Sequence, residues 1–300
     1  MSVYIRAHPL LGMALALAAL VVLMGMLSLY GCRRPLDPEL SRKLFHAGGG
    51  LVALAFPLLF ADAWPVLALA ALTGAGLHAL KRVRALRDGP GAVLYAVGRS
   101  SHGELYFPLS VALLFLLARG DALSYEVPLL ILTLADPVAA LVGAGYGRVR
   151  YPTVDGRGHK SVEGSLAFFV AALLGAQALL TCAGAGGLAS LLVATGVALA
   201  ATLAEALAWR GLDNLSVPLA AYLALELLPA AGASGLVALL ALAALSVVAL
   251  ARASTGSAST GSAGFQPAPV ATTAFAVVDP SAPGRIPASR RRSPVQNQGT

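Results

Sequence analysis

The sequence predicts an all-α protein, a polytopic membrane bundle of about nine transmembrane helices. Composition is the first reason: 58% of the 300 residues are hydrophobic, only 12% are charged, and the mean hydropathy is +0.78. Soluble domains carry about twice that share of charge. A soluble fold would therefore have too few polar residues to cover its apolar core, whereas a bilayer solvates apolar side chains directly.

The second reason is a series of apolar runs along the chain. About 20 helical residues cross a hydrocarbon core of about 30 Å. The runs lie at 8–30, 44–60, 63–80, 105–118, 127–145, 164–183, 187–208, 215–230 and 235–251. Two of them, 105–118 and 215–230, are short, which is compatible with re-entrant or partly broken helices held inside the protein.

The third reason is the placement of positive charge. All of the 21 Lys and Arg residues except Arg6 and Arg119 lie in the loops 31–43, 81–104, 146–163 and 209–214 or in the tail from 252. The alternate loops carry no basic residue at 61–62, 184–186 and 231–234. Because cytoplasmic loops are enriched in Lys and Arg, the pattern predicts an external N-terminus, a cytoplasmic C-terminus and an odd number of spans. The Ala-, Leu- and Gly-rich composition favours a bacterial inner membrane.

The two ends of the chain differ from its middle. A lipoprotein signal ending at Cys32 is an alternative to the first span, but Tyr30 does not fit the small residues expected near such a cleavage site. From 253 onward, Ser, Thr, Gly and Ala repeats lead into a Pro-rich stretch, which is typical of disorder. We therefore predict a membrane domain at 1–252 and a disordered cytoplasmic tail at 253–300.

Polar residues that lipid solvates poorly gather in the predicted cytoplasmic half of the bundle. Carboxylates can hold Mg²⁺, and basic side chains can neutralise phosphate groups. The convergence predicts a site for a phosphorylated ligand and a metal ion, with no nucleic-acid partner. The residues are Arg42, Lys43, His46, Glu104, Asp136, Lys160, Ser161, Glu163, Glu205, Asp213 and Asn214.

Asp136 is the acid that packing explains least well. It lies inside the run 127–145, where a carboxylate is costly and marks a functional site by default. Pro137 follows it and predicts that the helix is broken or kinked there, exposing backbone groups to a ligand. The later acids have structural alternatives: Glu205 suits an interhelical hydrogen bond, and Asp213 suits a helix N-cap.

A glycine cluster and a basic pair are candidates for phosphate binding. The backbone amides around Gly143 and Gly147 could cradle a phosphate, although tight helix packing explains such glycines equally well. Arg42 and Lys43 could neutralise phosphates, and the alternative is a pair of topology-setting charges at the interface.

The segment from Lys160 to Gly164 is a more specific candidate. A lysine just before a helix start, followed by Glu163 in the first turn, suits anion binding at a helix N-terminus. The alternative is that Ser161 simply caps the helix.

Five short segments between about residues 40 and 230 carry a family resemblance. They are Ser41-Arg42-Lys43 with His46, Gly103-Glu104-Leu105-Tyr106 with Pro108, Asp136-Pro137 with Ala139, Gly143 and Gly147, Lys160-Ser161-Val162-Glu163-Gly164-Ser165, and Glu205 with Asp213-Asn214 and Pro218. In these residues, their order and their spacing, the chain resembles the polyprenol kinase family, which includes dolichol, phytol and CTP-dependent diacylglycerol kinases.

The resemblance implies phosphoryl transfer from a nucleoside triphosphate, typically CTP, to the hydroxyl of a lipid alcohol at the bilayer surface, with Mg²⁺ as cofactor. The predicted catalytic residues are Asp136, Lys160, Glu163 and Asp213, and the predicted metal ligands are Asp136, Glu205 and Asp213. The predicted nucleotide contacts are Arg42, Lys43, Gly143, Gly147, Lys160, Ser161 and Gly164. His46, Glu104 and Asn214 are further expected site residues.

Two other functions stay open at this stage. Phosphatidate cytidylyltransferases resemble the chain in the Asp-to-Gly stretch and around Lys160, but their C-terminal motif is absent here, where Asp213-Asn214-Leu215 stands instead. A transporter would suit broken helices and buried carboxylates. No internal repeat relates the two halves, however, and the polar residues gather on one side.

Overall fold

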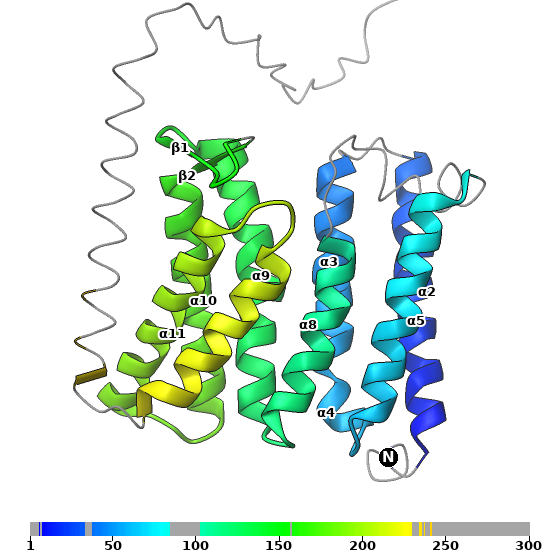
Figure 1. The fold of residues 1–300 in the computed structure, drawn as a ribbon, viewed down its shortest axis with the longest axis horizontal. Coiled ribbons are helices and arrows are strands. Elements are labelled where there is room, and N and C mark those ends of the chain that lie inside the picture. Colours follow the sequence, from blue (N-terminus) through cyan, green and yellow to red (C-terminus); the bar gives the residue numbers. More distant parts are fainter. Residues whose placement is uncertain are drawn as a thin grey trace, which may run out of the picture. The chain divides into compact units, whose positions relative to one another are not determined.

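The computed structural model describes residues 8–33, 38–84, 103–156 and 158–229, with Arg6 and a few positions between 234 and 241. The described residues form a set of helices and one short hairpin (Figure 1). The helices are α2 (Pro9–Arg33), α3 (Pro38–Leu54), α4 (Phe56–Leu59), α5 (Trp64–Arg82), α8 (Gly103–Ala118), α9 (Ala122–Tyr146), α10 (Val162–Cys182), α11 (Gly187–Leu207) and one further helix at 213–229.

The helical class is confirmed, since the predicted apolar runs up to 215–230 fall on helices, with 44–60 divided between α3 and α4. Four helices are long and apolar enough to cross a membrane, at Pro9–Gly31, Ala122–Tyr146, Val162–Cys182 and Gly187–Leu207. These helices indicate a membrane protein. The ninth run, 235–251, lies largely outside the described residues, and the number of spans and the orientation of the termini stay predictions.

The predicted span 44–60 has different bounds in the structure. α3 ends at Leu54, and α4 begins at Phe56. Pro57 has no N–H, so it cannot donate to the carbonyl four residues earlier, that of Ala53. The Tyr125 hydroxyl donates to that carbonyl instead, at 2.8 Å. A side chain from α9 thus satisfies the backbone group that the proline leaves unpaired.

α9 is the helix on which both hydrophobic clusters meet. Val127 and Ile131 pack in a cluster with α10, α11 and the helix at 213–229, whereas Tyr125 and Leu129 pack in a cluster with α2, α3, α5 and α8. Of the break or kink predicted at Pro137, the break is absent, because α9 is helical from Ala122 to Tyr146. Packing on both sides offsets the single hydrogen bond that the proline removes.

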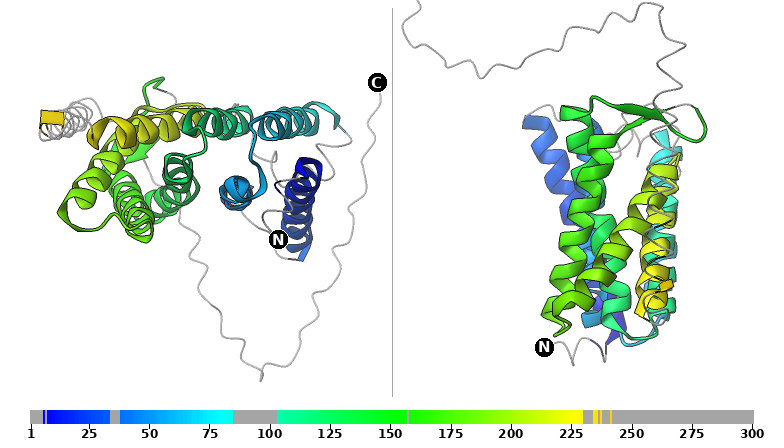
Figure 2. Two further views of the ribbon diagram at one scale, coloured as in Figure 1. Left: turned by 90° about the horizontal axis from the view of Figure 1, so that it is seen from below. Right: turned by 90° about the vertical axis from the view of Figure 1, so that its left-hand side faces the viewer.

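A short β-hairpin joins α9 to α10, and the sequence did not predict it. Strands β1 (Arg150–Pro152) and β2 (His159–Ser161) are antiparallel, with Tyr151 opposite Lys160. Strands of three residues are too short to show an alternating pattern. Figures 1 and 2 place the hairpin at the end of the helices where α9 ends, α10 begins and α11 ends.

Candidate functional site

The first part of the site is a buried ion pair between α3 and α9. Lys43 Nζ lies 2.5 Å from Asp136 Oδ2, and the two side chains are 14% and 9% exposed. Glycines allow this close approach. A Cβ on Gly50 of α3 would lie 2.1 Å from Thr133 Oγ1 of α9, and Gly48 is similarly close to Leu23 of α2. Small residues at a helix interface let the backbones approach, so Lys43 is brought to Asp136.

The second part is an ion pair between the hairpin and α11. Lys160 Nζ, from β2, lies 2.7 Å from Glu205 Oε1 and also donates to the backbone carbonyl of Glu205. α11 ends two residues later at Leu207. The last carbonyls of a helix lack intrahelical partners and carry the negative end of its dipole. The ammonium group therefore binds both a carboxylate and a helix C-terminus.

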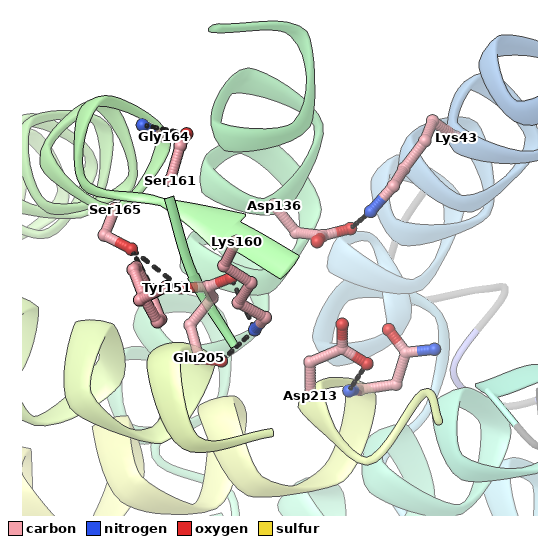
Figure 3. A network of polar contacts seen from close by, with 10 residues as sticks. Lys43, Asp136, Tyr151, Lys160, Ser161, Gly164, Ser165, Glu205 and Asp213 are labelled. Carbon is pink, nitrogen blue, oxygen red and sulfur yellow. Dashed lines mark hydrogen bonds and ion pairs between the residues drawn. The ribbon is translucent and has the colours of Figure 1, made fainter. Parts of the chain in front are cut away.

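Two hydroxyl groups extend this second pair into a network (Figure 3). Ser165 Oγ of α10 donates to Glu205 Oε2 at 3.4 Å, and Tyr151 Oη of β1 lies 2.7 Å from Ser165 Oγ. Burial raises the pKa of Tyr151 to about 12, the hydrogen bond with Ser165 opposes this rise, and the charge of Glu205 adds to it. The Tyr151 phenol is therefore protonated at physiological pH and able to donate a hydrogen bond.

The third part is the start of the helix at 213–229. The Asn214 backbone N–H donates to Asp213 Oδ1 at 3.0 Å, and Asn214 Nδ2 donates to the Gly103 carbonyl of α8 at 3.0 Å. Asp213 lies within electrostatic range of Asp136, Lys43 and Lys160. Figure 3 shows Asp213 near both pairs without a bond to either lysine. Among the described residues, Asp136 and Glu205 each form an ion pair with a lysine and Asp213 does not.

The predicted phosphate-binding glycines have a packing role in the structure. A Cβ on Gly147 would lie 2.8 Å from Ser161 Oγ, and one on Gly143 would lie 3.1 Å from the same atom. Ser161 caps α10, accepting the Gly164 N–H at 3.1 Å. Close packing of α9 on the start of α10 thus accounts for all of these residues without a ligand, and phosphate binding by them stays a prediction.

The remaining four predicted residues lie outside the two ion pairs. Glu163 accepts the Val149 N–H at 3.1 Å and so ties α10 to the start of the hairpin. His46 packs edge-on against Phe107 of α8, with 4.5 Å between ring centroids. Its Nε2 is buried and finds no hydrogen-bond partner among the described residues. Arg42 lies within electrostatic range of Asp136, and only the backbone of Glu104, in the first turn of α8, is described.

The predicted metal ligands are not gathered into one cluster. In the described part of the chain, no three His, Cys, Asp or Glu side chains are placed to hold a metal ion. Lys43 holds Asp136, and Lys160 holds Glu205. Mg²⁺ commonly uses one or two carboxylates and takes its other ligands from water and substrate phosphates. Asp213 and Asp136, which are close enough to interact electrostatically, fit that smaller donor set.

Comparison with known proteins gives one informative match. No family model and no solved structure match the chain. The chain is 35% identical over 191 residues to a phytol kinase of Synechocystis sp., an alignment that covers 62% of this chain and 78% of the relative. The chain belongs to the polyprenol kinase family. Membership in the polyprenol kinase family confirms the resemblance carried by the five sequence segments.

Two residues were not predicted from the sequence: Tyr151, which belongs to this site, and Tyr125, which supports the packing of α3 on α9 away from it. Tyr151 was not singled out because it lies in a basic loop with no predicted strand. Tyr125 was hidden in an apolar run, although Pro57 signals that a carbonyl on α3 needs another donor. Ser165 belonged to the resembling segment, but its link to Glu205 depends on how α10 packs against α11.

Proposed function

We propose that this protein is a lipid-alcohol kinase. It transfers the γ-phosphoryl group of a nucleoside triphosphate, CTP by family resemblance, to the hydroxyl of a polyprenol, a phytol-like alcohol or diacylglycerol. The relationship to a phytol kinase supports a kinase that acts on an alcohol. The observation that carries the proposal is the gathering of two lysines and three carboxylates at one end of the helices, from five separate segments.

The two lysines are the phosphate-binding groups in this proposal. Phosphoryl transfer depends mainly on positioning and on neutralising charge at the phosphate oxygens. Lys43 and Lys160 are each compensated by one carboxylate, so each is stable in a partly buried position before the nucleotide arrives. Lys43 comes from a helix and Lys160 from the hairpin, and so the two approach the ligand from different elements.

Asp136 has two roles in this proposal, and Asp213 shares the second. Lys43 holds Asp136 Oδ2, and within the described residues Asp136 Oδ1 receives no hydrogen bond, so it is able to accept one from the acceptor hydroxyl. This contact would orient the hydroxyl oxygen towards the γ-phosphorus. Mg²⁺, when bound, would neutralise charge on the phosphate oxygens, and Asp213 with Asp136 would hold it.

The location of Asp136 favours a substrate that arrives through the bilayer. Asp136 lies on α9, one of the helices able to span a membrane. An amphiphilic alcohol keeps its hydroxyl near the polar end of such a helix and its tail in lipid. A nucleotide reaches the same end from water, where the hairpin with Lys160 lies.

The direct test incubates the purified full chain with Mg²⁺, γ-labelled CTP and a panel of phytol, polyprenols and diacylglycerol, followed by lipid extraction. Label in an organic-soluble product is expected, and it identifies the acceptor at the same time. Pyrophosphate released on addition of phosphatidate, with no labelled lipid, would instead establish a cytidylyltransferase. Folded protein that gives neither signal would contradict the proposal.

A further inference from the structure

The hairpin is tied to α10 and α11 by a closed ring of interactions. Tyr151 bonds to Ser165, Ser165 donates to Glu205, and Glu205 accepts from Lys160. Lys160 is in turn the strand partner of Tyr151. Side chains of directly opposed residues in an antiparallel pair point to the same face, so both extend towards the two helices (Figure 3).

The hydrogen bonds of this ring have a defined direction. The Ser165 hydroxyl has one hydrogen, and the Glu205 carboxylate can only accept, so Ser165 donates to Glu205. Tyr151 must then donate its own hydrogen to Ser165 Oγ. The contact between Ser165 and Glu205 is long, at 3.4 Å. A weak contact of this kind depends on the serine hydroxyl being held in one rotamer, and that is what the Tyr151 phenol does.

The ring also fixes how many donors Lys160 has left. An ammonium group carries three N–H donors. Two of them go to the carboxylate and the backbone carbonyl of Glu205. The third has no acceptor among the described residues, so its direction is set by the other two. A lysine held at two points is better oriented than a freely rotating one.

We infer that Tyr151 is a positioning residue of the nucleotide site: through Ser165 it holds Glu205, and Glu205 orients Lys160 so that its remaining N–H points to a phosphate oxygen. This inference rests on the proposed function. In this arrangement Tyr151 contacts neither the nucleotide nor the lipid alcohol. Replacing Tyr151 should therefore change the orientation of Lys160 and, through it, nucleotide binding alone.

The first experiment measures Tyr151→Phe in the purified full chain with Mg²⁺, CTP and the preferred alcohol. Phenylalanine keeps the aromatic ring of this buried residue, which is 2% exposed, and removes only the hydroxyl. Loss of one buried hydrogen bond corresponds to a change of roughly two- to tenfold in affinity. The KM for CTP should rise by that factor, while kcat and the KM for the alcohol stay within twofold of the wild type.

Matched variants separate positioning from general damage. Ser165→Ala should reproduce the rise in the KM for CTP, and Ser165→Thr, which keeps a hydroxyl, should restore it. Tyr222→Phe is the control, because it removes a hydroxyl that donates to the Leu117 carbonyl at 3.1 Å, away from the hairpin. It should leave all three constants unchanged.

The decisive comparison uses a Lys160→Met background. If Tyr151 acts through Lys160, Tyr151→Phe adds nothing to the KM for CTP once Lys160 is gone. A further rise in that background, or an unchanged KM for CTP in the single variant, overturns the inference while leaving the kinase intact. If the wild type phosphorylates no alcohol at all, the proposed function fails and the inference with it.

Discussion

The two lysine–carboxylate pairs of the site have similar distances but are positioned by different means. Lys43 and Asp136 lie on α3 and α9, two helices whose backbones approach closely at Gly50. Lys160 lies on a three-residue strand and reaches Glu205 with the support of hydroxyl groups from β1 and α10. The first pair depends on helix packing and the second on a hydrogen-bonded ring.

The difference shows how rigid and less rigid elements hold reactive groups. A side chain on a packed helix has its direction set by the backbone, so a single contact is enough. A side chain on a short hairpin needs several partners to be held in one orientation, because the hairpin has little core of its own. The variants below test whether the helix-borne pair and the hairpin-borne pair respond differently.

The largest effect is expected at the helix-borne pair. Asp136→Asn keeps the shape of the side chain but removes the charge, leaving the buried Lys43 without its ion-pair partner. Label transfer from CTP to the alcohol should fall by about 100-fold or more. Glu205→Gln should lose less, since an amide oxygen and the Glu205 backbone carbonyl still accept from Lys160.

The control for these two variants is Asp62→Asn in the exposed connection before α5. It should retain wild-type transfer. Circular dichroism of each purified variant establishes that the helices are intact. Equal losses in Asp136→Asn and Glu205→Gln would remove the distinction between the pairs, and full activity in Asp136→Asn would exclude the role proposed for that carboxylate.

A smaller effect is expected from separating α3 and α9. Gly50→Ala places a Cβ 2.1 Å from Thr133 Oγ1, so one of the helices must move. Overpacking of this kind costs about 1–3 kcal/mol. The thermal unfolding temperature in detergent should fall, and label transfer should fall with it because Lys43 moves away from Asp136.

Gly76→Ala on α5 is the matched control for Gly50→Ala. An added Cβ there meets no atom within 4 Å. Alanine is the better helix former by about 1 kcal/mol, so the unfolding temperature should stay equal or rise. A Gly50→Ala variant that unfolds like the Gly76→Ala variant would show that the close approach of α3 to α9 is not what holds the first pair.

The smallest effect is expected at the tip of the hairpin. Asp155 Oδ2 lies 3.5 Å from Arg210 Nε, and the Arg210 side chain is 44% exposed. Exposed pairs contribute about 0–1 kcal/mol and are screened by salt. Asp155→Asn should therefore change the KM for CTP by less than about twofold. A tenfold rise would mean that the tip contact, more than the ring at Tyr151, positions Lys160.

Much of the site was predictable because its residues break a local pattern. Asp136 stands out as a carboxylate in an apolar run, and Lys160 and Glu163 stand out at a helix start. Other predictions depended on distances between helices, which no local sequence pattern contains. Gly143 and Gly147 suit phosphate binding or packing equally well on sequence grounds, and the contact with Ser161 Oγ provides the packing explanation.

The sequence by itself determined the helices, their apolar character and the end at which polar groups gather. These properties follow from runs of neighbouring residues, since apolar length and loop charge are local quantities. Only the tertiary structure decided which lysine pairs with which carboxylate. Lys43 and Asp136 are 93 residues apart, and Lys160 and Glu205 are 45 apart. Such pairs form because packed helices and the hairpin bring them together, and that packing depends on glycines and hydroxyls whose roles appear only once the elements are in contact.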